Sequence, residues 1–344
     1  MNAPPSALAE PVRVGLIGAG RIGTAHAETL ARRVPGAHLV AIADPRPGAA
    51  EKVAAPLGAR AVTDPAELFS DPEVEAIVIA ASSTAHTQLI LAATAADKAV
   101  FCEKPMAETL ADADRAIAAA KAAGRPLQVG FNRRFAPAFR EAHDVIAAGG
   151  IGTPQLLRSL TRDPGLANPG AVPPWTIFTQ TLIHDFDTLN WLNPGAEPVE
   201  VYATADALVA PAFKGAGLLD TAVVVIKFDN GAIATAEANF SAVYGYDVRA
   251  EAFGSAGMVN AGDTALTGMT HHTAAGRAQR TVRSDVELFG DAYTAEFASF
   301  VQAVRTGQAP EVTGVDARRA LAIALACIES CQARGPVPLP KGDQ

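Results

Sequence analysis

The chain has 344 residues, of which 49% are hydrophobic, and a formal net charge of −8. This length is sufficient for two domains with large buried cores. The acidic balance argues against nucleic acid and anionic membranes as partners, because both favour basic surfaces, and no window reaches the ~18 consecutive apolar residues of a membrane helix.

The three cysteines are too few for a disulfide framework. Cys327 and Cys331 are four apart on a predicted helix, without the Cys and His clusters of a metal site. Buried thiols in a reducing cytosol are therefore the favoured interpretation. Residues 1–11 lack the charged segment and apolar run of a signal peptide, so we expect a loose tail on a cytoplasmic protein.

A glycine-rich turn follows the first apolar segment. Val12–Ile17 suits a strand covered on both faces, and it runs into Gly18-Ala19-Gly20-Arg21-Ile22-Gly23. In a dinucleotide fingerprint these glycines allow the tight turn, the approach of a pyrophosphate and close packing of the next helix. The helix predicted from Ile22 to about Arg33 would direct its N–H groups at the phosphates.

An acidic residue ends the second predicted strand. Leu39–Ala43 leads to Asp44, about 20 positions after the last glycine of the turn, where an acid would meet the ribose hydroxyls of NAD. Its charge would repel a 2′-phosphate, so the sequence favours NAD over NADP. Arg46 could stack on adenine or accept a phosphate, which leaves NADP open as a secondary cofactor.

Strands and helices continue to alternate up to residue 130. We predict strands at 61–62, 76–80, 99–102 and 127–130, and helices at 50–57, 65–69, 87–96 and 109–123. This alternation predicts a parallel, doubly wound sheet. Ser82, Ser83 and His86 follow strand 76–80 at its carboxyl end, where the cofactor would lie. His86 could equally be a structural residue at the start of the next helix.

The apolar strand Ala99–Cys102 stops at Glu103-Lys104-Pro105. Proline has no N–H and cannot continue a central ladder, so Lys104 is expected at a bend at the carboxyl end of a strand. That edge of an open α/β sheet binds ligands. A surface ion pair would explain an isolated Glu-Lys-Pro, but the dinucleotide fingerprint favours proton chemistry or polarisation of an oxygen by Lys104.

The segment Phe131–Phe135 marks the expected boundary between a dinucleotide-binding domain, 12–131, and a second domain, 132–340. In the second domain we predict strands at 155–162, 199–208, 221–229, 232–240 and 247–254. Turns at 229–231 and 254–257 indicate hairpins and hence antiparallel pairing. Val315–Cys331 is expected to be the closing helix.

One predicted helix has a polar stripe. At 100° per residue, four residues fall within roughly 60° of one another: Gln180, His184, Asp187 and Trp191. Apolar residues cover the opposite side: Leu182, Phe186 and Leu189. Such a stripe is usually solvated, and a lone histidine is usually structural. Asp187, one turn after His184, could instead orient the imidazole for proton transfer.

Taken together, these segments resemble the Gfo/Idh/MocA oxidoreductases and, more narrowly, the inositol dehydrogenases. The resemblance runs from Val12 to about Ala333 and rests on 18–23, 44, 103–105, 128–135, 181–187, 244–247 and 291–297. It implies a Rossmann domain and a C-terminal α+β domain with a large, mostly antiparallel open sheet. Such sheets pack helices on one face and often form a dimer or tetramer with the other.

The resemblance also implies the chemistry. A secondary carbinol of a cyclic polyol, myo- or scyllo-inositol in type, would give hydride to NAD near Lys104 and its hydroxyl proton to His184, oriented by Asp187. Lys104 would stabilise the developing charge, although it could instead be the base. The implied cofactor-binding residues are Gly18, Gly20, Arg21, Ile22, Asp44, Arg46, Ser82, Ser83, His86, Glu103 and Lys104. The implied substrate-binding residues are Lys104, Arg133, Thr161, Asp163, Gln180, Thr181, His184 and Tyr244.

Three positions depart from the resemblance. Many inositol dehydrogenases have an aspartate where Gln180 stands, and glutamine cannot take a proton, so His184 would rely on Asp187 and its pKa would be less raised. Asn132 replaces a common methionine, and Ala136 replaces a common acid. These changes leave another inositol isomer or an aldose open as the substrate.

Two further interpretations stay open. A non-catalytic sensor of dinucleotide and sugar would keep the fold, although Lys104 and His184 are both retained and the sequence has no visible DNA-binding motif. A ketose or imine reductase would run the reaction in the opposite direction.

Overall fold

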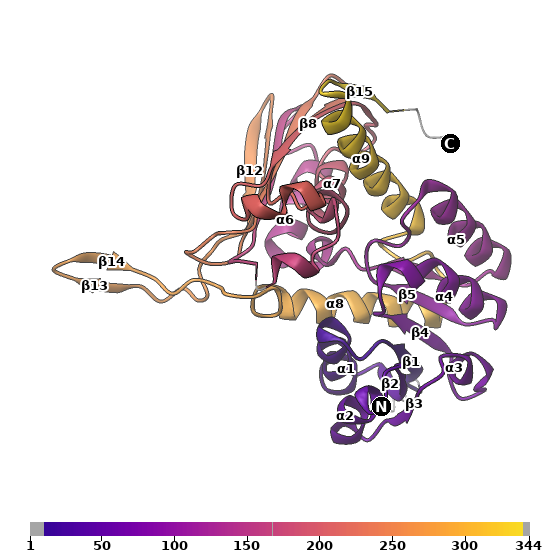
Figure 1. Cartoon of the computed structure of the whole chain (residues 1–344). Helices are drawn as coiled ribbons and strands as arrows, with labels where there is room; N and C mark the ends of the chain where they lie inside the picture. Colours follow the sequence, from indigo (N-terminus) through magenta and orange to yellow (C-terminus); the bar gives the residue numbers. More distant parts are fainter. Residues whose placement is uncertain (1–9, 167, 340–344) are drawn as a thin grey trace, which may run out of the picture. The chain divides into compact units, whose positions relative to one another are not determined.

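The computed structural model describes residues 10–166 and 168–339 (Figure 1). Most of the predicted tail, 1–11, lies outside these residues. The chain forms two compact units. The first contains residues up to 107 together with 111–130 and 293–314, and the second contains 108–110, 131–292 and the residues from 315 onward. The predicted division into 12–131 and 132–340 stays a prediction.

The first unit is built on a six-stranded parallel sheet in the order β3-β2-β1-β4-β5-β6, which confirms the doubly wound prediction. Its strands are β1 Val12–Ile17, β2 Ala37–Ala43, β3 Arg60–Val62, β4 Ala76–Ile79, β5 Ala99–Cys102 and β6 Leu127–Val129. Every residue of β4 and β5 is buried, as expected for apolar strands covered on both faces.

Short helices connect these strands. They are α1 Arg21–Arg33, α2 Ala49–Ala54 with the 3-10 turn η1 Ala55–Leu57, α3 Ala66–Ser70, α4 Ser83–Ala95 and α5 Leu110–Ala123. Helix α4 begins earlier than the predicted Thr87, because Ser82 already takes the extended conformation of an N-cap residue.

The core of the first unit includes residues from far along the chain. Helix α8, Asp285–Thr306, contributes Phe297, Phe300 and Val301 to the core cluster. The rings of Phe101 and Phe297 lie 4.7 Å apart between centroids. Residues 293–314 therefore cluster with the first unit, whereas the sequence analysis placed them in the second domain.

The second unit is built on a mixed seven-stranded sheet in the order β12-β11-β7-β10-β9-β8-β15. Its strands are β7 Pro154–Arg162, β8 Pro198–Asp206, β9 Thr221–Phe228, β10 Ile233–Asn239, β11 Asp247–Gly254, β12 Gly257–Ala261 and β15 Val337–Pro338. The pairing is antiparallel except between β7 and β10. The mostly antiparallel prediction is confirmed, but consecutive hairpins do not build the whole sheet, because β7 lies between β10 and β11.

Helices cover one face of this sheet. Helix α7, Ile183–Trp191, packs on β7 and β10, and α9, Gly314–Ala333, is joined to β8 through Ser330 Oγ, which accepts a hydrogen bond from the Ala203 N–H at 2.9 Å. Strand β9 alternates between buried and exposed residues, so its other face is open. Helix α6, Pro137–Ala147, and the length of α8 were not predicted from the sequence.

Shorter elements complete the second unit. They are the 3-10 helices η2 Asn132–Phe135, η3 Pro169–Ala171 and η5 Pro211–Ala216, the π-helix η4 Ile177–Thr181, and a ribbon of β13 His271–Thr273 and β14 Gly276–Ala278. The ribbon extends away from the seven-stranded sheet (Figure 1). Among the helices of the described residues, none has the length and apolar character that crossing a membrane requires.

Candidate active site

The glycine turn after β1 has the geometry that a pyrophosphate requires. Gly18 has a φ of +106°, and a Cβ there would lie 2.4 Å from the Ala80 carbonyl oxygen. A Cβ at Gly23 would lie 1.9 Å from the Gly18 oxygen. At Gly20, no described heavy atom would come within 4 Å of a Cβ, so the space beside the backbone is open. Helix α1 begins at the next residue, and the Gly20 N-cap has no side chain that would cap it, as is usual where a helix N-terminus binds an anion.

Asp44 lies at the end of β2 as predicted, and it is 3% exposed. Its Oδ2 accepts hydrogen bonds from the Ala19 N–H and from Arg46 Nη2, both at 2.8 Å, and its Oδ1 accepts from Arg46 Nε at 2.9 Å. The Arg46 hydrogen bond lowers the pKa of Asp44 to about 2, although burial opposes this. Asp44 is therefore an anion at neutral pH, and its charge compensates that of Arg46.

Two cavities flank Arg46 within the first unit. One of about 510 Å³ is lined by residues that include Gly20, Arg21 and Thr24. The other, of about 320 Å³, is lined by Asp44, Val62 and Thr63 among others. The glycine turn, the anionic Asp44 and these cavities together fit the adenosine and phosphate portions of a dinucleotide. Ser82 is exposed at the start of α4, while Ser83 and Ile22 are partly exposed.

Lys104 follows the end of β5 and is partly exposed, but its neighbours point inward. His86 is 1% exposed, with Nδ1 2.8 Å from the Pro105 carbonyl oxygen and Nε2 3.1 Å from the Ala81 carbonyl oxygen. Burial lowers the pKa of His86, and the hydrogen bonds to the two carbonyl oxygens oppose this. Both predicted roles of His86, as a cofactor contact and as a structural residue, stay predictions. Glu103 is also buried, with Oε1 2.7 Å from His26 Nε2.

A buried ion pair joins η2 to α7 in the second unit. Arg133 Nη1 donates to Asp185 Oδ1 at 2.8 Å, and Arg133 Nη2 donates to Thr161 Oγ1 at 2.5 Å. Thr161 Oγ1 in turn donates to Asp185 Oδ2 at 2.7 Å, and Ser159 Oγ donates to Asp185 Oδ1 at 2.5 Å. Arg133 and Thr161, predicted to contact substrate hydroxyls, are thus 2% exposed each and bonded to internal partners.

Sequence reasoning missed Asp185, although it adjoins His184. A pattern on β7 could have indicated a polar partner here. Ser159 and Thr161 are two positions apart, so their hydroxyls face the same side of the sheet. Tyr246 was also missed. Burial raises its pKa, and the charge of Asp163 adds to the effect.

A second ion pair holds Asp187, which was expected to orient His184. Arg134 Nε donates to Asp187 Oδ2 at 2.9 Å, Nη2 donates to Oδ1, and Nη2 also reaches Asp316 at 3.0 Å. Burial raises the pKa of Asp187, and the Arg134 guanidinium opposes this. Asp187 is 1% exposed, so a solvated stripe is wrong at this position. We refer to Arg133–Asp185 and Arg134–Asp187 as the arginine pairs.

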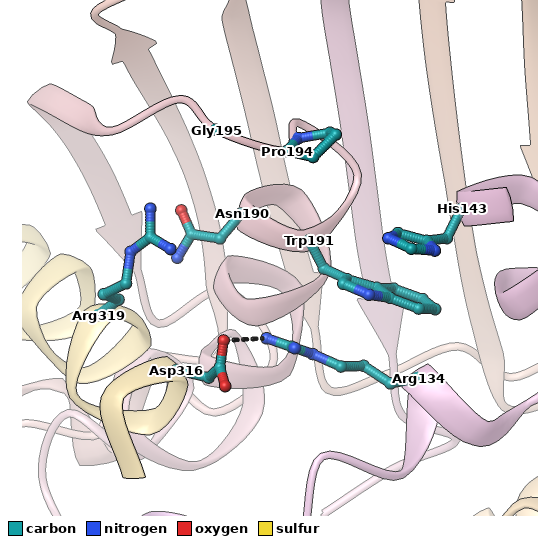
Figure 2. Close-up of a pocket in the computed structure, with 8 residues that line it drawn as sticks. All are labelled: Arg134, His143, Asn190, Trp191, Pro194, Gly195, Asp316 and Arg319. Carbon is teal, nitrogen blue, oxygen red and sulfur yellow. Dashed lines mark hydrogen bonds and ion pairs between the residues drawn. The ribbon is translucent and has the colours of Figure 1, made fainter. Parts of the chain in front are cut away.

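Figure 2 shows how the far end of α7 is held. Trp191 stacks on His143 with centroids 4.2 Å apart, and the Arg134 guanidinium lies 5.7 Å from the indole centroid. A cavity of about 150 Å³ is lined by these residues together with Asn190, Pro194, Gly195, Asp316 and Arg319. The arginine pairs and this stack fix α7 and therefore the backbone that carries His184.

The remaining predicted residues are more accessible. His184 is partly exposed and lies edge-on to Phe131, with centroids 5.7 Å apart. Gln180 and Thr181 are partly exposed in the π-helix η4. A π-helix has more residues per turn than an α-helix, so the predicted angle between Gln180 and His184 is wrong. Tyr244 is 44% exposed, and its hydroxyl donates to Asp247 Oδ2 at 2.6 Å. Asp163 is partly exposed beyond β7.

The first unit is defined by its parallel sheet, glycine turn and acidic β2 terminus as a Rossmann dinucleotide-binding domain. The comparison with protein families agrees. Residues 12–131 match "Oxidoreductase family, NAD-binding Rossmann fold", and residues 139–260 match "GFO/IDH/MocA C-terminal domain". The chain belongs to the Gfo/Idh/MocA oxidoreductase family.

Relatives extend the match to nearly the whole chain. A myo-inositol 2-dehydrogenase of Thermotoga maritima is 38% identical over 95% of this chain and 98% of its own length. A scyllo-inositol 2-dehydrogenase (NAD(+)) of Bacillus subtilis is 36% identical, with coverages of 95% and 96%. The crystal structure of scyllo-inositol dehydrogenase from Lactobacillus casei with bound NAD(H) and scyllo-inositol aligns with a TM-score of 0.91 at 26% identity, with coverages of 96% and 99%.

Proposed function

We propose that this protein is an NAD-dependent dehydrogenase that oxidises a secondary carbinol of an inositol. The observation that carries the proposal is Lys104 at the carboxyl end of β5, in the same sheet as the glycine turn and Asp44. Relatives that match over almost their full length are named inositol dehydrogenases. Bound NAD would supply the hydride acceptor.

The residues of the first unit would bind and orient the cofactor. The open backbone at Gly20 and the N-terminus of α1 suit the pyrophosphate. Asp44 would accept hydrogen bonds from the ribose hydroxyls, and its negative charge disfavours a 2′-phosphate. The positive charge of Arg46 is compensated by Asp44, which leaves less charge to attract a 2′-phosphate. Any use of NADP would therefore be secondary.

Lys104 and His184 would handle the carbinol oxygen and its proton. An ammonium at Lys104 would donate a hydrogen bond to the oxygen and stabilise the negative charge as it develops. The imidazole of His184 would take the hydroxyl proton. The alternative assignment has Lys104 as the base. The pH dependence of kcat in His184→Gln separates the two, because the limb of the profile that reports the base disappears if His184 is the base and persists if it is Lys104.

Roles for the other predicted residues follow from their exposure. Asp163, Gln180, Thr181 and Tyr244 are exposed or partly exposed, and we propose them as contacts for substrate hydroxyls. For Arg133, Thr161 and Asp187, whose partners are internal, we propose positioning roles, in which the arginine pairs fix η2, β7 and α7.

The substrate panel tests this proposal. NADH formation would be followed with myo-inositol, scyllo-inositol, other inositol isomers and common aldoses. Relatives named for both myo- and scyllo-inositol leave the isomer open, as do Asn132, Ala136 and Gln180. Turnover with aldoses alone would favour the sugar dehydrogenase alternative. NAD binding without turnover in either direction on any of these compounds or on their ketones would favour a sensor.

We also propose a homo-oligomer, a dimer or a tetramer, formed through the open face of the seven-stranded sheet. The strand register places four exposed apolar residues in one row across β10, β7, β11 and β12: Ile233, Leu156, Phe253 and Met258. Such a row would be a poor surface for a monomer. A second copy of this chain is the occupant that the family resemblance implies.

Sedimentation velocity would test this interface. Phe253→Glu should lower the mass of the particle, whereas Leu208→Glu, at an exposed apolar residue between β8 and η5, should leave it unchanged. A wild-type monomer would contradict the proposal.

All three cysteines are free, which is consistent with the reducing cytosol that we propose as the compartment.

A further inference from the structure

The residue before Lys104 makes a fully internal side-chain contact with a histidine. Glu103 is 7% exposed, and its Oε1 lies 2.7 Å from Nε2 of His26, which is 0% exposed. The imidazole is enclosed by aromatic rings, with Phe297 edge-on at 4.9 Å and Tyr293 at 5.3 Å between centroids. We refer to this contact as the His26–Glu103 pair. It joins α1, which begins at the nucleotide-binding turn, to the end of β5.

The same carboxylate also contacts the backbone of Lys104. The Lys104 N–H donates to Glu103 Oε2 at 3.1 Å. A Cβ at position 130 would lie 3.2 Å from the Glu103 carboxyl atoms, so Gly130 leaves the room that this group occupies. One oxygen of Glu103 thus serves α1 and the other serves Lys104. A change at His26 would reach Lys104 through a single side chain.

The charge of Glu103 is set by its surroundings. Five titratable groups among the described residues interact electrostatically with the Glu103 carboxyl. They are His26 on α1, His86 on α4, Glu296 on α8, and the chain neighbours Lys104 and Cys102. Burial would raise the pKa of Glu103, but the hydrogen bond from His26 and the nearby positive charges outweigh it and lower the pKa. The anionic form is therefore favoured at neutral pH.

Glu296 has the opposite character. It is 0% exposed, and among the described residues neither of its carboxyl oxygens has a hydrogen-bond partner. Burial and the negative charge of Glu103 raise its pKa well above the usual range. The neutral form of Glu296 is therefore favoured, and Glu103 carries the negative charge of this cluster.

We propose that His26 is a positioning residue for the dehydrogenase reaction, which holds Glu103 as an ordered anion and thereby fixes Lys104 relative to α1. The inference rests on the proposed function of Lys104. The simpler reading, a polar pair that only stabilises the core, predicts that loss of the pair lowers stability and leaves the kinetics of the folded enzyme unchanged.

Variants at His26 separate the two readings. His26→Leu removes the donor and keeps an apolar side chain among the aromatic rings, whereas His26→Gln places an amide N–H near the former Nε2. If His26 positions Lys104, His26→Leu should lower kcat roughly tenfold or more, with the Kd for NAD changed less than about threefold. His26→Gln should recover most of that loss. Glu296→Gln keeps the neutral form and should leave kcat and its pH profile unchanged.

A readout that does not need turnover distinguishes this inference from the proposed function. Acetylation of Lys104 across a pH series, followed by mass spectrometry, reports on the charge beside its ammonium. His26→Leu makes Glu103 easier to protonate and less ordered, so acetylation of Lys104 should begin at lower pH than in the wild type, and His26→Gln should restore the wild-type profile.

A kcat loss in His26→Leu with recovery in His26→Gln, together with the shifted acetylation profile, supports the positioning role. An unshifted acetylation profile, or wild-type kcat in the folded His26→Leu enzyme, overturns it. A wild type that turns over no polyol or sugar refutes the proposed function, while the acetylation profiles still decide whether His26 acts on Lys104.

Discussion

The two units both bury carboxylates, but they compensate them differently. The second unit uses the arginine pairs, in which each aspartate accepts hydrogen bonds from a guanidinium. The first unit uses the His26–Glu103 pair and keeps Glu296 neutral. Arginine stays charged at every pH at which proteins fold, whereas histidines and perturbed carboxylic acids exchange protons within that range. The second unit therefore compensates its buried aspartates with guanidinium groups that stay charged, whereas the first places Glu296, a carboxyl with a strongly raised pKa, beside Glu103.

The largest effect that we expect from this difference is on stability. Asp185→Ala leaves Arg133 charged and buried without its carboxylate, which should lower the free energy of unfolding by roughly 3 to 5 kcal/mol. Urea denaturation measures this. The control is Arg125→Ala at the exposed Asp97–Arg125 pair, which should cost much less, because water solvates both charges. Equal losses in the two variants would show that burial does not distinguish these pairs.

The first unit should respond to pH in the opposite sense to an ordinary ion-paired acid. The folded-state pKa of Glu296 is raised, so the unfolded chain gives up this proton first, and the wild type loses stability as pH rises above about 4.5. Glu296→Gln does not titrate. Its advantage over the wild type should therefore grow by roughly 1 to 3 kcal/mol between pH 5 and pH 8. A difference that is constant across this range would mean that Glu296 is ionised when folded.

A smaller effect is expected at the cofactor. Asp44→Ala removes the proposed ribose acceptor and frees Arg46, so the Kd for NAD should rise about tenfold while NADP binding improves. Isothermal titration calorimetry with both cofactors measures this. Gly48→Ala is the control for backbone effects. Gly48 lies just beyond Arg46 with a φ of +73°, and no described heavy atom would come within 4 Å of a Cβ there. Unchanged NAD affinity in Asp44→Ala would exclude the ribose contact.

The same contrast explains how far the sequence could predict the structure. The Rossmann sheet, the glycine turn and the place of Asp44 follow from local features, since each strand is an apolar run that ends at a polar residue or a glycine. The position of Lys104 after β5 follows from the proline beside it. These elements depend on neighbours in the chain and were predicted from them.

Long-range partners could not be predicted in this way. Asp187 lies one turn after His184, yet its partner is Arg134, which comes from η2. The π-helix at 177–181 changes the angular position of Gln180, and no residue pattern announced it. Residues 293–314 join the first unit because Phe297 packs on Phe101, a contact between residues almost 200 positions apart. The partner of a side chain, a local π-helix and the packing of distant segments depend on the folded surroundings rather than on neighbours in the chain.

NADH formation by Lys104→Ala, with the inositol that the wild type uses best, decides whether Lys104 takes part in the reaction. We expect a kcat at least about 100-fold below that of the wild type, with the Kd for NAD nearly unchanged, because Lys104 acts on the carbinol oxygen and the cofactor is held by the glycine turn and Asp44. A Lys104→Ala enzyme with the kcat of the wild type would contradict this role.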